Sequence, residues 1–276
     1  MRYADRSSRG KLRFTGPQRA WFLHQIVTRS FEDISVGESR SGAMLTSKGR
    51  MVGFFEAVAT DDEILMHFED SLGETFPEEF RRYLFATQVE IDDVTGEMGL
   101  ILLVGEGWQD LAGKLSGGVT HETNALGTPA GYVWVPRSEL SGAIEVIADG
   151  AAEISEGELE ALRIDGGIPR WGRDMDQRSI PQEARLEEFG ALDFDKGCYV
   201  GQETVAKIHF RGKVNRKVRR LEAAGPVAVG DDVSVDGEPA GTVTSAAGQN
   251  ALAILKHTIE PGTKVKIGAL DATVLS

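Results

Sequence analysis

The chain contains one cysteine, Cys198, and it lies in the segment DKGCYVGQET at 195–204. Lys196 precedes it by two residues, so in extended backbone the two side chains point to the same side. A nearby ammonium favours the thiolate, which is the reactive form of a cysteine. We therefore name Cys198 and Lys196 as candidate catalytic residues. The alternative is that Cys198 is a small buried side chain with no chemical role.

The residues that follow the cysteine could bind an oxygen atom. Gly201 permits a turn or the close approach of a ligand. The segment QETVAKI predicts a short helix with Glu203 in its first turn, where the helix dipole stabilises a carboxylate. The free amides of that turn could receive an anionic or carbonyl oxygen. Between Lys207 and Arg220 there are seven Lys or Arg residues and no acid, which form either a solvated face or a socket for an anionic ligand tail.

The apolar pattern around this segment predicts an α+β protein. A strand at 11–16, a helix over about 17–28, a hairpin around SKGR and a helix over 76–88 come first. Four strands, among them AIEVIA at 143–148, and one short helix predict a small α+β subdomain at about 90–150. Ser155 and Glu158 form a capping box that opens a helix. Short β-rich runs between glycines predict a small barrel or sandwich at 215–276, after a larger region at 1–214.

Composition narrows the class of protein. The net charge of -13 opposes direct binding to nucleic acid or to an anionic membrane. The longest apolar run, 98–105, is too short to span a bilayer, and the first residues lack the apolar core of a signal peptide. A single cysteine fits a reducing compartment, so we expect the cytoplasm. The five histidines lie more than 40 residues apart, and no metal site is predicted from their spacing.

The segment KGCYVGQE resembles the signature of the YgfZ family of folate-binding proteins, relatives of the aminomethyltransferase (T-protein) of glycine cleavage. Other segments resemble the family in the same order along the chain. They are KLRFTGPQRAWFLHQIVT, LTSKGRM, ALRIDGGIPRWGRDMD and AKIHFRGKVNRKV. The resemblance covers nearly the whole chain. It implies a ring-like fold of three subdomains with a C-terminal barrel, arranged around a channel for tetrahydrofolate or a derivative.

The resemblance also assigns residues to the folate. Asp165 falls where relatives carry a glutamate that contacts the pterin, and a carboxylate can accept two parallel N–H bonds from its edge. Trp171 could stack on the ring or belong to the core. Arg211 could receive the folate glutamate tail. The signature loop is expected to border the channel through Tyr199, Gly201, Gln202 and Glu203.

One departure bears on activity. Glycine-cleavage enzymes carry an aspartate after the first hairpin, where this chain has Gly53 and Phe54, and Glu56 is the nearest carboxylate. Glycine cleavage is therefore not expected. The leading hypothesis is a folate-binding accessory protein that supports iron–sulfur cluster assembly or repair in client enzymes, without holding a cluster alone. The alternatives are a tetrahydrofolate-dependent one-carbon transferase or demethylase, and an interaction protein that binds no folate.

Overall fold

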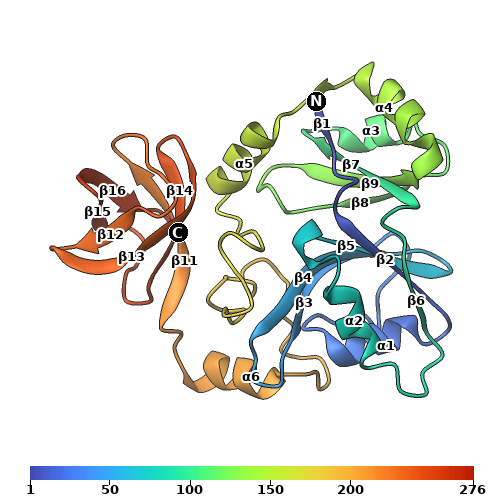
Figure 1. Ribbon diagram of the computed structural model, residues 1–276, viewed down its shortest axis with the longest axis horizontal. Helices are drawn as coiled ribbons and strands as arrows, with labels where there is room; N and C mark the ends of the chain where they lie inside the picture. The colour runs from blue at the N-terminus through green and yellow to red at the C-terminus, as the bar shows by residue number, and fades with distance from the viewer.

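The computed structural model describes residues 1–276. Three lobes surround a long segment at 166–200 that contains no helix or strand (Figure 1). Two lobes each contain a five-stranded sheet, and the third is a closed barrel. The predicted α+β class and C-terminal barrel are confirmed. The predicted division into units at 1–214 and 215–276 stays a prediction, although the barrel strands run from Arg216 to Val274.

The first lobe is an antiparallel sheet covered on one face by two helices. Its strands are β2 (Gly10–Thr15), β3 (Ser39–Leu45), β4 (Met51–Ala59), β5 (Glu63–Phe68) and β6 (Glu90–Asp93), in the order β3-β4-β5-β2-β6. The helices are α1 (Arg19–Ile26) and α2 (Phe76–Arg81), and a 3-10 helix at Asp70–Leu72 follows β5. The core between helices and sheet is rich in phenylalanine, because Phe14, Phe22, Phe55, Phe76 and Phe80 are all buried there.

The second lobe has the sheet order β10-β1-β7-β9-β8. Its strands are β1 (Arg2–Asp5), β7 (Met98–Val104), β8 (Val119–Glu122), β9 (Ala130–Pro136) and β10 (Ala152–Glu153). The helices α3 (Trp108–Ala112) and α4 (Leu140–Ala148) pack on one face, and a 3-10 helix at Arg137–Glu139 precedes α4. The strand predicted at 143–148 is wrong, because this segment is part of α4. Leu140, Ala143 and Ile147 recur at helical spacing and are the buried residues of α4.

The uncovered faces of the two sheets pack against each other. Val58 and Leu65 of the first sheet share a core with Leu102, Tyr132 and Trp134 of the second. Val58 pairs with Leu65 across β4 and β5, and Glu56 pairs with His67 two residues further along these strands. Because side chains two residues apart share a face, Glu56 and His67 also point into the interface between the sheets.

The remaining elements connect these lobes to the barrel. The predicted capping box is present at the start of α5 (Glu156–Asp165), where Ser155 Oγ accepts from Glu158 N at 3.3 Å and Glu158 Oε2 accepts from Ser155 N at 3.0 Å. Ile164 packs on Val218 and Leu252 of the barrel. α6 (Gln202–Arg211) precedes the barrel strands, which are β11 (Arg216–Ala223), β12 (Asp232–Val235), β13 (Glu238–Ala247), β14 (Asn250–Lys256), β15 (Lys264–Ile267) and β16 (Leu270–Val274).

None of these helices combines the length and the apolar character that crossing a membrane requires.

Candidate functional site

A pocket is lined by residues of the two sheets, of α5 and of the segment 166–200. Its apolar walls come from Phe54 of β4, Tyr132 of β9 and Trp171 and Phe189 of the long segment. Its charged residues are four glutamates and four arginines, namely Glu56, Glu69, Glu156, Glu160, Arg6, Arg9, Arg163 and Arg170. An apolar cleft with a few convergent polar groups is the usual form of a small-molecule site, so this pocket is the candidate functional site.

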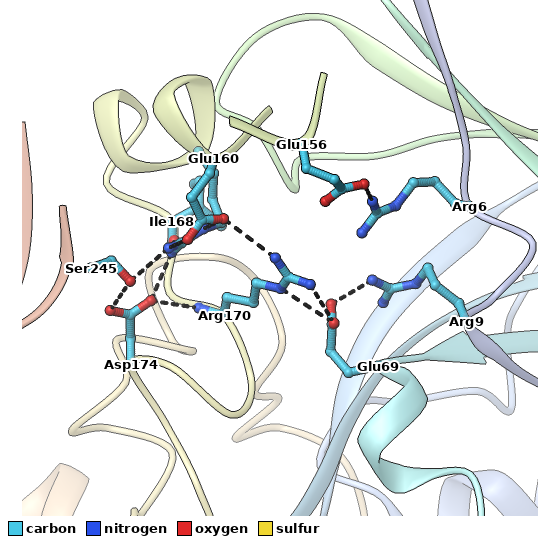
Figure 2. Close-up of polar contacts among 10 residues, drawn as sticks. Arg6, Arg9, Glu69, Glu156, Glu160, Ile168, Arg170, Asp174 and Ser245 are labelled. Atoms are coloured by element: carbon cyan, nitrogen blue, oxygen red, sulfur yellow. Dashed lines mark hydrogen bonds and ion pairs between the residues drawn. The ribbon is translucent and has the colours of Figure 1, made fainter. Parts of the chain in front are cut away.

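Most of the pocket charges are paired with one another (Figure 2). Glu69 accepts hydrogen bonds from Arg9 Nη1 at 2.5 Å and from Arg170 Nη2 at 2.9 Å. Arg170 also reaches Glu160 at 3.4 Å, and Arg6 pairs with Glu156. Burial alone would raise the pKa of Glu69, but Arg9 and Arg170 lower it to about 2. Glu69 is therefore ionised at neutral pH and joins the first lobe to α5 through Arg170.

The network continues from α5 into the barrel. Arg163 is 5% exposed, and its guanidinium donates to Asp174 Oδ2 at 2.7 Å and to Ser245 Oγ at 2.7 Å. Asp174 accepts further hydrogen bonds from Ser245 Oγ at 2.8 Å and from Arg170 N at 3.0 Å. Charged side chains from the first lobe, α5 and the long segment are thus connected without a break to the hydroxyl group of Ser245 on β13.

Glu56 differs from the other pocket carboxyl groups because no arginine is hydrogen-bonded to it. Its side chain is 7% exposed and lines the pocket. Thr123 Oγ1 donates to Glu56 Oε2 at 2.6 Å, and the same hydroxyl accepts from Ala125 N at 3.1 Å. Burial raises the pKa of Glu56 above its ordinary value. The sequence left the direction of this side chain open, and strand alternation in β4 places it at the pocket.

Two histidines lie behind Glu56 in the interface between the sheets. His67 is 0% exposed and His121 is 2% exposed. Arg9 Nε donates to His67 Nδ1 at 3.0 Å, and Trp134 Nε1 donates to His121 Nδ1 at 3.4 Å. Burial lowers the pKa of His121 to about 3 and that of His67 well below its ordinary value, so both rings are neutral. Each Nδ1 is an acceptor, so each Nε2 carries the hydrogen.

Glu56, His67 and His121 together have the composition of a metal site. One carboxylate oxygen of Glu56 and one ring nitrogen of each histidine lie within 4.8 Å of one another. A histidine that binds a metal must offer a lone pair and normally donates its other N–H to an acceptor. Here both Nδ1 atoms receive hydrogen bonds and both Nε2 atoms carry hydrogens. The set therefore does not fit a metal ion.

Of the residues assigned to the folate from the sequence, Trp171 lines the pocket. Asp165 does not. It is the last residue of α5, and its exposed side chain pairs with Arg220 and lies 3.5 Å from Asn250 Nδ2, on the side of the barrel. The inward face of the helix is formed instead by Leu159, Glu160 and Arg163.

The contacts of Lys196 also differ from the predicted ones. Lys196 Nζ donates to the carbonyl oxygens of His24, Val27 and Arg29, at and beyond the end of α1. Burial lowers the pKa of Lys196 to about 7, while the three oxygen atoms favour its charged form. These hydrogen bonds use all three donors of the ammonium, so none is left for Cys198. Helix ends leave carbonyl groups without partners, and Lys196 satisfies them here.

The rest of the signature loop lies outside the pocket as well. Tyr199 is buried in the core of the first lobe, with Lys196 Nζ 5.0 Å from its ring centre. Gly201 has φ +82°, and a Cβ atom there would lie 2.4 Å from the carbonyl oxygen of Thr46 in the β3–β4 turn. Gln202, Glu203 and Arg211 belong to α6 and do not line the pocket. The signature loop instead packs against the turn between β3 and β4, directly before α6 begins.

The basic segment after α6 is largely neutralised by neighbouring acids. Arg216 pairs with Glu183 at 3.1 Å and Lys217 with Glu188 at 2.6 Å. Arg219 pairs with Glu260 at 3.0 Å, and Arg220 pairs with Asp165 as described. The predicted socket for an anionic tail is therefore reduced to three side chains without ion-pair partners, which are Lys207, Arg211 and Lys213.

Replacing Lys196 with methionine is expected to lower the free energy of unfolding by about 2 kcal/mol, because three carbonyl groups lose a charged donor. Alkylation of Cys198, which is exposed, is expected to proceed in the folded variant at the wild-type rate. Urea denaturation and timed labelling measure the two quantities, with Lys213→Met as the control. Much slower labelling of the folded Lys196→Met protein would instead support the predicted activation of the thiol.

Comparison with known proteins agrees with this architecture. The glycine cleavage system aminomethyltransferase T from Bartonella henselae superposes with a TM-score of 0.88 over 99% of this chain and 84% of that one, at 15% identity. The fold is therefore that of an aminomethyltransferase T. Residues 215–274 match the family model of the CAF17 C-terminal β-barrel domain.

Several relatives are similar to most of this chain. The chain is 27% identical to the putative transferase At1g60990, chloroplastic, of Arabidopsis thaliana, over 88% of this chain and 61% of that protein. It is 23% identical to the tRNA-modifying protein YgfZ of Colwellia psychrerythraea, over 75% of this chain and 67% of that protein. It is 25% identical to the mitochondrial iron-sulfur cluster assembly factor IBA57 homolog of Pyricularia oryzae, over 76% of this chain and 54% of that protein. The chain is thus similar, over 75% and 76% of its length, to a protein named YgfZ and to an iron–sulfur cluster assembly factor. It spans less than two thirds of the chloroplast and mitochondrial relatives.

Proposed function

We propose that the chain binds a reduced folate, tetrahydrofolate or a derivative, in the central pocket and acts as an accessory protein in iron–sulfur cluster assembly or repair. The observation that carries the folate proposal is Glu56, the pocket carboxyl group without an arginine partner, set among apolar walls. The accessory role is supported by relatives named for tRNA modification and for iron–sulfur cluster assembly. Iron–sulfur enzymes are the proposed clients, and a cytoplasmic location stays a prediction.

The pocket offers a separate group for each part of a folate. Glu56 takes the pterin-binding role assigned from the sequence to Asp165, because a carboxylate can accept two N–H bonds from the pyrimidinone edge. Trp171 and Phe54 offer aromatic and apolar surface to the flat ring. The pocket arginines are already paired with acids, so the anionic tail of the ligand would compete with Glu69, Glu156 or Glu160 for a guanidinium group. Cys198 is the only cysteine and is exposed, so a cluster would need ligands from another protein.

Glu56 also favours a second candidate, a tetrahydrofolate-dependent one-carbon transferase or demethylase. A carboxyl group whose pKa is raised by burial keeps its proton to a higher pH than an ordinary glutamate, which suits it to exchange a proton with a reacting amine. This supplies an acid in the pocket although Gly53 and Phe54 occupy the position of the missing aspartate. Turnover of methylated amines with tetrahydrofolate, abolished by Glu56→Gln, would select this candidate over the accessory role.

Calorimetry with 5-formyltetrahydrofolate tests the binding proposal. We expect saturable binding to the wild-type chain and roughly ten-fold weaker binding to Trp171→Ala, because a stacked aromatic surface contributes about 0.5–1.5 kcal/mol beyond its buried area. Asp165→Ala is the matched control, since its side chain lies on the barrel side of α5, and its affinity should equal that of the wild type. No heat of binding at millimolar ligand would refute the proposal.

A further inference from the structure

We propose that Glu56, His67 and His121 form a subsite that recognises the lactam edge of a pocket ligand, the adjacent N–H and C=O groups of a 4-oxo-pteridine. This inference rests on the proposed folate binding and makes it specific. Glu56 is the acceptor for ring N–H groups, and the two histidines are donors for the ring carbonyl oxygen. Nothing in the sequence placed the histidines near each other or near the pocket.

The fold brings the three side chains together from both sheets. Glu56 and His67 are cross-strand partners on β4 and β5, and His121 on β8 is the cross-strand partner of Tyr132 on β9. The ring centres of His67 and His121 are 5.6 Å apart, and that of Tyr132 is 4.4 Å from His67. Glu56 and Tyr132 both line the pocket. The two buried histidines therefore adjoin the part of the pocket wall that Glu56 and Tyr132 form.

The hydrogen bonds already made fix what the histidines can offer. Arg9 and Trp134 can only donate, so they hold both Nδ1 atoms as acceptors and leave both Nε2–H groups as donors. Both Nε2 atoms are buried and have no partner in the protein. A buried donor without an acceptor is costly, and two of them in one cluster indicate an acceptor that comes from outside the chain.

The size of the cluster suits an oxygen atom. Because one carboxylate oxygen of Glu56 and one ring nitrogen of each histidine lie within 4.8 Å of one another, the cluster spans less than two hydrogen-bond lengths of about 2.8 Å each. A carbonyl oxygen beside this cluster can accept from the imidazole groups while the neighbouring ring N–H donates to Glu56. The order of donors and acceptors matches a 2-amino-4-oxo ring. A 4-amino ring would set its own N–H groups against those of the histidines.

Folic acid and aminopterin test the subsite because they differ only by an oxo or an amino group at position 4. Calorimetry at pH 7 compares both ligands in their neutral ring forms on the full chain, using wild type, His121→Phe, His121→Gln and the control His257→Phe. We expect wild type to prefer folic acid by at least about ten-fold. The preference should be lost in His121→Phe and retained in His121→Gln, whose amide keeps an N–H donor, and in His257→Phe.

The possible outcomes distinguish failure of the lactam subsite from failure of folate binding. Equal affinity of the wild type for both ligands would overturn the lactam subsite even if no variant folds. A preference that survives in folded His121→Phe, checked by its thermal unfolding, would also overturn it. Binding of neither ligand, nor of 5-formyltetrahydrofolate, would instead refute folate binding itself and the subsite with it.

Discussion

Replacing Asp174 with alanine is expected to destabilise the protein by about 3 kcal/mol, because it removes the fully buried acceptor of the Arg163 guanidinium and leaves that group only its pairing with Glu160. Asp174 is 1% exposed, and it accepts from Arg163, Thr244, Ser245 and the backbone of Arg170. Water cannot replace these contacts without opening the junction between α5 and the barrel. The cost is therefore that of several buried donors that lose their shared acceptor rather than that of one lost hydrogen bond.

Urea denaturation of the full chain measures this loss. Asp271→Ala is the control, because Asp271 forms an ion pair with Lys266 at 2.8 Å but its side chain is 81% exposed. Such a surface pair contributes about 0–1 kcal/mol. A loss below about 1 kcal/mol for Asp174→Ala, equal to that of the control, would mean that the network does not hold the barrel in place.

Replacing Glu56 with alanine is expected to weaken the binding of 5-formyltetrahydrofolate by roughly 30- to 150-fold, or about 2–3 kcal/mol. The loss comes from a charge-assisted acceptor that no other pocket carboxyl group can replace, since those are engaged by arginines. Because burial raises the pKa of Glu56, its ionised form is lost on acidification sooner than that of an ordinary glutamate. Affinity should therefore fall as the pH falls toward that raised pKa, and the Ala variant should lack this component.

Calorimetry between pH 5 and pH 8 measures both effects in one series. Glu238→Ala, at an exposed position of β13, serves as the control for a change of net charge. If Glu56→Ala binds the ligand as tightly as the wild type at every pH, the pterin ring does not contact this carboxyl group.

The sequence correctly predicted those structural features that depend only on neighbouring residues. The capping box of α5 and the hairpin around SKGR need only a few neighbouring residues, and both are present. The short apolar run at 143–148 gave a wrong strand prediction, because six apolar residues fit a strand or a helix equally well. The segment forms a helix, which buries its apolar side chains against the sheet. The pairing of β1 with β7, nearly 100 residues later, carries no local signal.

The site depended on such distant pairings. Glu56 and His67 face each other because of the β4–β5 register, and His121 joins them only when two sheets pack face to face. The position of Asp165 depends on how the barrel docks against α5, which the resemblance of RIDGG to its relatives does not specify. Trp171, which was assigned to the folate from the sequence, lines the pocket. The motif around it places it in the long central segment, and this position does not depend on how α5 is oriented.

The ion-pair network that runs from Arg9 to Ser245 makes the barrel a thermodynamic partner of the pocket. Arg170 contacts Glu69 and Glu160 through its side chain and Asp174 through its backbone. A ligand that favours one arrangement of Arg170 thereby favours one placement of the barrel. Such coupling is reciprocal, so a protein that docks on the barrel must change ligand affinity by the factor by which the ligand changes docking. The ligand-bound and ligand-free forms of the chain would then present the barrel to the same client in different placements.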